Sequence, residues 1–224
     1  MIYITGDTHI PCDISKIGTK KFPDSKKLSK NDFIIICGDF GGVWNNDNEE
    51  LYWRKWLNNK TFTTLFVDGN HENFNLLNKF EIIDFCGGKV HKISDSIYHL
   101  MRGQIYEIEG NRFFTFGGAS SHDKEYRIKD KNWWEEELPS NSEFDYAKTN
   151  LEAVAWNVDY IVTHCAPTSI QQIINSRFDT DKLTDFFETI KEKATYKKWF
   201  FGHYHIDKTI DERFYCLFNN IFQI

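Results

Sequence analysis

The residue types best suited to chemistry occur where short apolar runs of this sequence end. Five such runs are each followed by Asp, Asn or His, and glycine precedes the polar residue in four of them. Glycine permits sharp turns and close backbone approach, which a crowded binding site requires. The five segments are Gly6-Asp7-Thr8-His9, Gly38-Asp39-Phe40-Gly41-Gly42, Asp68-Gly69-Asn70-His71-Glu72, Thr163-His164-Cys165 and Gly202-His203-Tyr204-His205.

These segments offer imidazole, carboxylate and amide donors, a mixed set that suits Mn, Fe or Zn better than Ca. A carboxylate can bridge two ions, and two ions about 3.5–4 Å apart can clamp a phosphoryl group and supply a metal hydroxide near neutral pH. Two divalent ions would outweigh the charges of Asp7 and Asp39 and leave a cationic centre for phosphate. We therefore expect two divalent cations, with Mn as the first choice and Fe or Zn as alternatives.

The elements that must position these residues are strands covered on both faces. Continuous apolar runs of four to seven residues are typical of such strands. Ligands of α/β proteins bind outside the carboxyl ends of the strands, so the polar residues are expected to meet at one rim. The expected strands are Met1–Thr5, Asp32–Cys37, Thr63–Val67, Asp159–Thr163 and Lys198–Phe201.

Helical periodicity alternates with these strands and indicates an α/β fold. Helices are expected over Glu49–Asn58, Phe144–Trp156 and Asp181–Lys193, and Ser140 with Glu143 has the spacing of a capping box. Further strand candidates are dense in the middle and at the C-terminus, and a second sheet packed on the first would absorb them. They are Val90–Ile93, Ile97–Met101, Gln104–Glu109, Arg112–Phe116, Lys208–Ile210, Phe214–Leu217 and Ile221–Gln223.

No linker or repeat divides the chain, so residues 1–224 are expected to form a single domain. Residues 117–141 are the longest stretch without clear periodicity. Long irregular segments inside a domain are often functional, so this segment is a candidate lid or cap loop over the site.

The ordered pattern DxH, GDxxx, GNHE, H and GHxH resembles the calcineurin-like metallophosphoesterase superfamily over residues 7–205. The resemblance implies a four-layer αββα sandwich of two mixed β-sheets flanked by helices, with a dinuclear metal site at the strand C-terminal ends. It also implies a metal-bridging hydroxide that attacks phosphorus in line. His71 would be no ligand, but a general acid or electrostatic stabiliser near the leaving-group oxygen. The implied ligands are Asp7, His9, Asp39 and His205 for one metal, and Asp39, Asn70, His164 and His203 for the other.

The second block reads GDFGGVW and lacks the Asp-Arg-Gly extension that protein Ser/Thr phosphatases typically carry. The paired histidines of GHYH resemble the phosphodiesterase-like branches instead. Another cation must then grip the phosphate, and the candidates are Arg102, Arg127 and Arg177. His122 is either a further site residue or part of a solvated loop.

We therefore expect a metal-dependent phosphoesterase, in particular a phosphodiesterase acting on a nucleotide-type or other small phosphoester. The alternatives are a phosphomonoesterase or Ser/Thr protein phosphatase, and, in another class, a non-catalytic scaffold or binding module on the same fold. A nuclease is a third possibility, and it would need a basic groove.

The amino-acid composition limits the classes of partner that the protein can be expected to bind. The 224 residues include 27 Lys and Arg against 33 Asp and Glu, which gives a net charge of −6. Coating a long nucleic acid requires many cationic side chains, so no stable nucleic-acid partner is expected. No apolar run is long enough for a membrane span, no signal-like start is present, and five cysteines without a CxxC pair suit a reducing compartment. We expect a cytoplasmic protein; the sequence does not indicate an oligomeric state.

Overall fold

The apolar runs of the sequence form the central strands of the protein. The computed structural model describes residues 1–224. Only the first residues of the second and fifth of these strands are not fully buried. Because both faces of these strands are covered, near-continuous apolar sequence is required. The strands are β1 (Ile2–Thr5), β2 (Phe33–Ile36), β3 (Thr63–Phe66), β9 (Tyr160–Thr163) and β10 (Lys198–Phe201).

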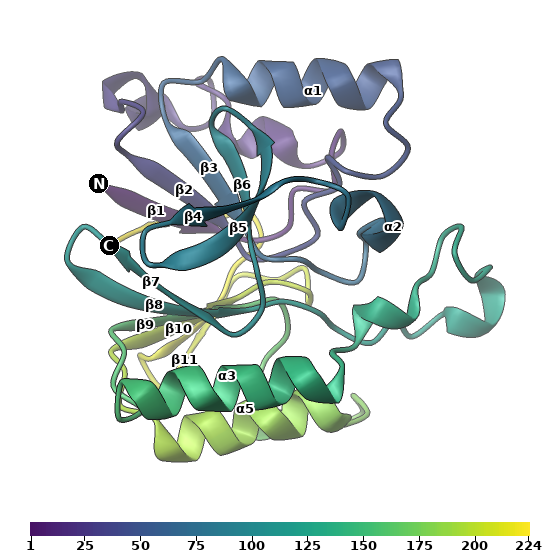
Figure 1. Cartoon of the computed structure of the whole chain (residues 1–224), viewed down its shortest axis with the longest axis vertical. Coiled ribbons are helices and arrows are strands. Elements are labelled where there is room, and N and C mark those ends of the chain that lie inside the picture. The colour runs from purple at the N-terminus through teal and green to yellow at the C-terminus, as the bar shows by residue number, and fades with distance from the viewer.

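Two mixed sheets are built around them (Figure 1). The first sheet has the order β13-β1-β2-β3-β6-β5-β4, in which β1, β2, β3 and β6 are parallel. The second has the order β11-β12-β10-β9-β8-β7, in which β12, β10, β9 and β8 are parallel. The remaining strands are β4 (Ile82–Phe85), β5 (Gly88–Ser94), β6 (Ile97–Leu100), β7 (Gln104–Ile108), β8 (Asn111–Phe116), β11 (Lys208–Ile210), β12 (Phe214–Cys216) and β13 (Ile221–Gln223).

The expected fold class is confirmed, but the strands are distributed differently from the expectation. The middle and C-terminal segments do not form a second sheet of their own. Instead β6 pairs with β3 and β13 with β1, while β8 pairs with β9. Strand periodicity shows which face is buried but carries no information about the pairing partner, because pairing depends on contacts between distant segments.

Apolar side chains join the layers into an αββα sandwich. Ile4, Ile35 and Leu65 stand in register on neighbouring strands and face the second sheet, where Phe113 and Phe200 belong to the same buried cluster. Helix α1 (Asn48–Asn58) covers the outer face of the first sheet, and α3 (Asn141–Ala153) and α5 (Lys182–Lys193) cover that of the second (Figure 1). None of the helices combines the length and apolar character that crossing a bilayer requires.

Capping side chains set where the helices begin. The Ser140–Glu143 capping box is present, and it starts α3 at Asn141, three residues before the expected start. Asp47 and Asp181 cap α1 and α5. Several shorter helical elements were not expected, because they are too short to show helical periodicity; they include α2 (Phe74–Leu77), α4 (Thr168–Ile174) and the 3₁₀ turns Ile14–Ile17 and Pro23–Lys27. Strand β4 was not expected either.

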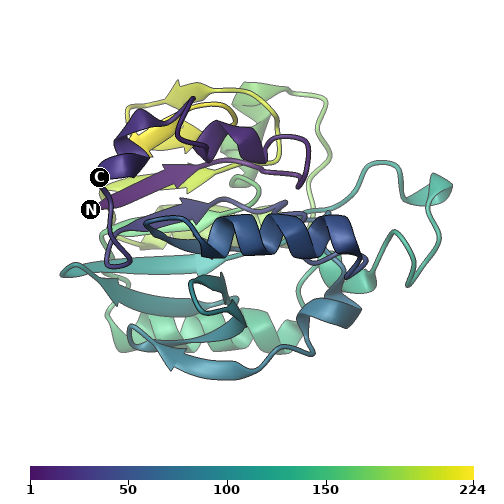
Figure 2. The same ribbon diagram turned by 90° about the horizontal axis from the view of Figure 1, so that it is seen from above.

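Residues 117–141 leave β8, project beyond the two sheets and return to α3 (Figures 1 and 2). The segment contains only two short 3₁₀ turns, Lys124–Tyr126 and Glu135–Glu137. Trp134 is fully buried, and its ring packs edge-on against Trp44 with centroids 5.2 Å apart. One end of the projection is thus anchored on the first sheet's side of the molecule.

A buried ion pair ties the end of β3 to β6 and to the projecting segment. Asp68 accepts hydrogen bonds from the Arg102 guanidinium, one of them from Nε at 2.9 Å, and His99 Nε2 lies 3.1 Å from its other oxygen. Arg102 also donates to the Glu136 carbonyl at 2.7 Å. Burial raises the pKa of Asp68, but the Arg102 and His99 partners outweigh it and hold the pKa below its usual range.

We expect Arg102→Met to destabilise the protein by about 3–5 kcal/mol, because the Asp68 carboxylate would remain buried without its guanidinium partner. Urea unfolding at neutral pH measures this loss. Lys148→Met is the matched control, since Lys148 pairs with Asp145 on the exposed face of α3 and such pairs contribute little. Equal unfolding midpoints for the two variants would contradict a structural role for the pair.

Candidate metal centre

The five polar segments meet where the carboxyl ends of β1, β2 and β3 face those of β9 and β10. The backbone N–H of His203 donates to the Asp7 carboxylate at 3.0 Å, and the N–H of His9 donates to the Asp39 carbonyl at 2.8 Å. Hydrogen bonds thus link strand ends both within the first sheet and across to the second. The structure brings together all seven expected ligands and His71.

One group of side chains could hold a divalent ion. One ligand atom from each of Asp7, His9, Asp39 and His205 lies within 4.8 Å of all the others. His9 Nε2 is 3.2 Å from Asp39 Oδ2, and His205 Nε2 is 3.1 Å from Asp7 Oδ2. Two carboxylates and two imidazoles form a donor set that fits Mn, Fe or Zn.

A second group lies on the other side of Asp39. His164 Nε2 is 3.1 Å from Asn70 Oδ1 and 3.4 Å from Asp39 Oδ1, and the His164 and His203 rings are 5.0 Å apart. Asp39 therefore turns Oδ2 toward His9 and Oδ1 toward His164. This is the arrangement that a carboxylate shared by two cations would need.

The charges of the site also fit bound cations. Asp7 and Asp39 are 0% and 1% exposed, and neither carboxylate pairs with a Lys or Arg side chain. Burying carboxylates without a cation is costly. Burial by itself lowers the pKa of His164, but Asp39 and Asp7 outweigh it and raise the pKa to about 10. The carboxylates thus give the pocket a strong preference for positive charge.

Hydrogen bonds outside the cluster orient the imidazoles. His164 Nδ1 lies 2.7 Å from the Cys37 carbonyl, so this nitrogen donates and Nε2 is the atom turned toward Asp39 and Asn70, where it would bind a cation in its deprotonated form. His9 Nδ1 lies 3.0 Å from Asp13, which leaves Nε2 facing the cluster. Asp13 was not expected at the site, although its position four residues after His9 was a usable signal.

The backbone at the site is held in an unusual conformation. His9, Asp39, His203 and His205 have φ values of +31°, +46°, +66° and +51°. Non-glycine residues adopt this left-handed region at a cost of about 1–3 kcal/mol each, and such residues cluster at functional sites. Neighbouring glycines leave room for the ligands: a Cβ at Gly69 would collide with the Asp39 carboxylate.

His71 lies at the edge of the cluster. Its backbone N–H donates to Asp39 Oδ1 at 2.8 Å, and its ring is half-buried, 5.7 Å from the His9 ring. Burial lowers the pKa of its imidazole, and the nearby Arg127 adds to the effect. His71 Nε2 is 3.5 Å from Arg127 Nη2, so the projecting segment brings one cation to the site.

The other candidates for substrate binding are placed differently. Arg102 is buried, and its hydrogen-bond and ion-pair partners are Asp68, Glu136 and Glu143; the structure does not bring it to the cluster. The expectation that Arg102 is free to bind phosphate therefore has no support, because its guanidinium is paired with carboxylates from distant parts of the chain. His122 is exposed at the rim, 6.0 Å from the His203 ring, and Arg177 is exposed with no side-chain partner.

Ser121 was not expected at the site, and nothing in its local sequence indicates it. Its Oγ accepts a hydrogen bond from Asn70 Nδ2 at 3.1 Å, and its backbone N–H donates to the buried Glu137 at 3.2 Å. The first bond turns the Asn70 amide oxygen toward His164. Residues 117–141 thus contribute to the orientation of a candidate ligand.

We expect Ser121→Ala to weaken binding at the Asn70 side of the centre about tenfold, because the amide loses the partner that fixes its orientation. Calorimetric titration with Mn²⁺, combined with electron paramagnetic resonance of the bound ion, would resolve the two sites. Ser120→Ala is the control, since the Ser120 side chain makes no hydrogen bond. Unchanged affinity at both sites in Ser121→Ala would contradict the role.

Comparison with known proteins agrees with this geometry. The family model for calcineurin-like phosphoesterases matches residues 1–207 and so spans every strand end that contributes to the cluster. A search of curated proteins found no match to the chain. Because the match covers most of the chain and all five polar segments, this protein belongs to the calcineurin-like phosphoesterase family.

Proposed function

We propose that this protein is a metal-dependent phosphodiesterase that hydrolyses a nucleotide-type or other small phosphoester with two divalent cations. The family supports a metal-dependent phosphoesterase in general. The observation that carries the proposal is the position of Asp39, whose two oxygens face two separate donor groups while its neighbour His71 stays outside both.

The proposed ligands are the two groups described above. Asp7, His9, Asp39 and His205 would hold one cation, and Asp39, Asn70, His164 and His203 the other. When bound, the cations would neutralise phosphoryl oxygens and lower the pKa of an attacking water. Mn²⁺ is the proposed metal, because the donors are a balanced mixture of oxygen and imidazole nitrogen and include no thiolate.

The chain's own side chains would complete the reaction. Arg127 is the cation closest to His71 and can hold a phosphate oxygen through its guanidinium. His71 would donate a hydrogen bond or a proton to the leaving oxygen, while its backbone N–H keeps Asp39 in place. His122, at the opposite rim beside His203, could contact the substrate from that side.

Two alternatives differ in specific ways. A phosphomonoesterase would use the same centre on a dianionic phosphate. A Ser/Thr protein phosphatase is less favoured, since the second motif lacks its Asp-Arg-Gly extension. A non-catalytic binding module would have no need for a complete ligand set and His71 together.

We expect the Mn²⁺-loaded protein to hydrolyse bis-p-nitrophenyl phosphate faster than p-nitrophenyl phosphate. Arg127 is the one cation beside His71 and already pairs with Asp123 at 2.7 Å, so little positive charge is left there for the second charge of a monoester. Release of p-nitrophenol measures both rates, and chelator-treated protein is the control. Faster monoester turnover favours the phosphomonoesterase, and no turnover of either with metal bound would contradict an enzyme.

His71→Ala should keep both metals and lose about 10²–10⁴-fold in turnover, because it removes a leaving-group donor while retaining the backbone N–H to Asp39. Asp39→Ala should lose metal at both positions, since it removes the shared carboxylate. Elemental analysis after desalting separates the two outcomes. Equal metal content in wild type and Asp39→Ala would show that Asp39 does not bridge.

A further inference from the structure

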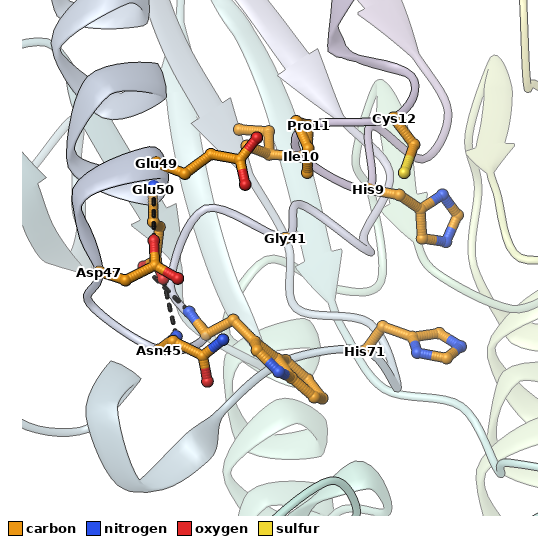
Figure 3. A pocket seen from close by; sticks show the side chains of 11 residues that line it. His9, Ile10, Pro11, Cys12, Gly41, Asn45, Asp47, Glu49, Glu50 and His71 are labelled. Carbon is orange, nitrogen blue, oxygen red and sulfur yellow. Dashed lines mark hydrogen bonds between the residues drawn. The ribbon is translucent and has the colours of Figure 1, made fainter.

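A cleft of about 340 Å³ opens next to the candidate metal centre, between the turn after β1 and the loop that enters α1 (Figure 3). His9 and His71 stand at one end, and Glu49 stands at the other (Figure 3). With His71 at the leaving oxygen, as proposed above, the leaving group lies on the side of the centre where this cleft opens.

The walls of the cleft combine apolar surface with negative charge. Ile10, Pro11 and Trp44 supply the apolar part, and no Lys or Arg lines the cleft. Glu49 is exposed, forms no hydrogen bond or ion pair, and extends its carboxylate across the opening toward Ile10 and Pro11 (Figure 3). Asp47 adds a second carboxylate, of which Oδ1 caps α1 through the Glu50 N–H at 2.9 Å.

The loop that leads into α1 and carries the acidic residues is rigidly built. The buried Glu50 carboxylate accepts hydrogen bonds from the backbone N–H groups of Trp44, Asn45 and Asn46 at 3.0, 2.7 and 2.8 Å. The Trp44 ring is braced by Trp134 at 83°. A preformed wall loses little entropy when a ligand binds, so its charge pattern can select among ligands.

Groups that favour an anion and groups that disfavour one therefore lie on different sides of the site. The candidate cation ligands and Arg127 form the part that suits phosphate, and Arg127 does not line the cleft. The cleft itself disfavours any negatively charged group, because Glu49 and Asp47 have no cation to offset them there.

We propose that this cleft binds the leaving group of the substrate and selects leaving groups that are neutral or cationic, with hydrogen-bond donors on an apolar or planar body. Glu49 and Asp47 disfavour a second phosphate or a carboxylate on the leaving group. The inference rests on the proposed function, since it assumes that phosphorus is attacked at the metal centre.

Two esters that differ in the charge of the leaving group test this selection, and the change of their ratio on substitution of Glu49 is the decisive reading, because the two phenols also differ in acidity. Both are aryl methyl phosphodiesters, one releasing 3-(aminomethyl)phenol and the other 3-hydroxybenzoate; the corresponding monoesters replace them if monoesters are the better substrates. The Mn²⁺-loaded wild type should favour the amine on the order of tenfold in kcat/KM, and Glu49→Gln should reduce this ratio at least threefold. Glu192→Gln, on the exposed face of α5, is the matched control and should leave the ratio unchanged.

Equal kcat/KM for the two esters, or a ratio that Glu49→Gln leaves unchanged, would overturn the proposed selection while the phosphoesterase function stands. Binding provides a test that needs no turnover. The free 3-(aminomethyl)phenol should shift the Trp44 indole N–H resonance at concentrations where 3-hydroxybenzoate does not, and Glu49→Gln should remove the difference. If neither these esters nor the two nitrophenyl esters are hydrolysed, the proposed function fails, and the titration still decides whether the cleft selects by charge.

Discussion

The buried carboxylate of Asp39 is the constraint around which the rest of the site is arranged. It lies at the junction of the two sheets, 1% exposed, with no Lys or Arg partner. A charge in that position is tolerated only when hydrogen bonds and positive charge surround it. The His71 N–H, the His9 ring and the His164 ring supply the hydrogen bonds and close contacts. The left-handed backbone of Asp39 and the absence of a side chain at Gly69 are consequences of fitting these groups into one place.

Support for the site reaches well beyond the groups that face it. Asp68, two residues before Asn70, is fixed by Arg102 and His99, and Asn70 itself is oriented by Ser121. Arg102 connects to residues 117–141 through the Glu136 carbonyl, and Ser121 belongs to that segment, where its backbone N–H donates to the Glu137 carboxylate. The projecting segment therefore reaches the carboxyl end of β3 through Arg102 and contacts the candidate ligand Asn70 through Ser121. A change in its packing would reach the metal centre through these two contacts.

The net charge of −6 is an average over regions of different local charge. Around the centre, imidazoles, Arg127 and the proposed cations favour phosphate, while Glu49 and Asp47 make the adjacent cleft acidic. A long polyanion would have to cross that acidic surface, whereas a compact ester would place its phosphate and its leaving group in separate environments. The overall composition and the local electrostatics thus favour the same class of small substrate.

The sequence by itself determined the α/β fold class, every strand except β4, and which residue types stand at the ends of the central strands. These depend on local properties: apolar runs specify buried strands, and Asp, Asn and His directly after them specify what the strand ends present. The Ser140–Glu143 capping box, also local, was predicted correctly. Only the tertiary structure decided that β6 pairs with β3 and that the Ser121 side chain orients Asn70. It also decided that Arg102 forms a buried ion pair with Asp68, whereas Arg127 lies beside His71. These outcomes join residues far apart in the chain, and their free energy comes from burial and pairing in the folded state, which residue type and spacing do not encode.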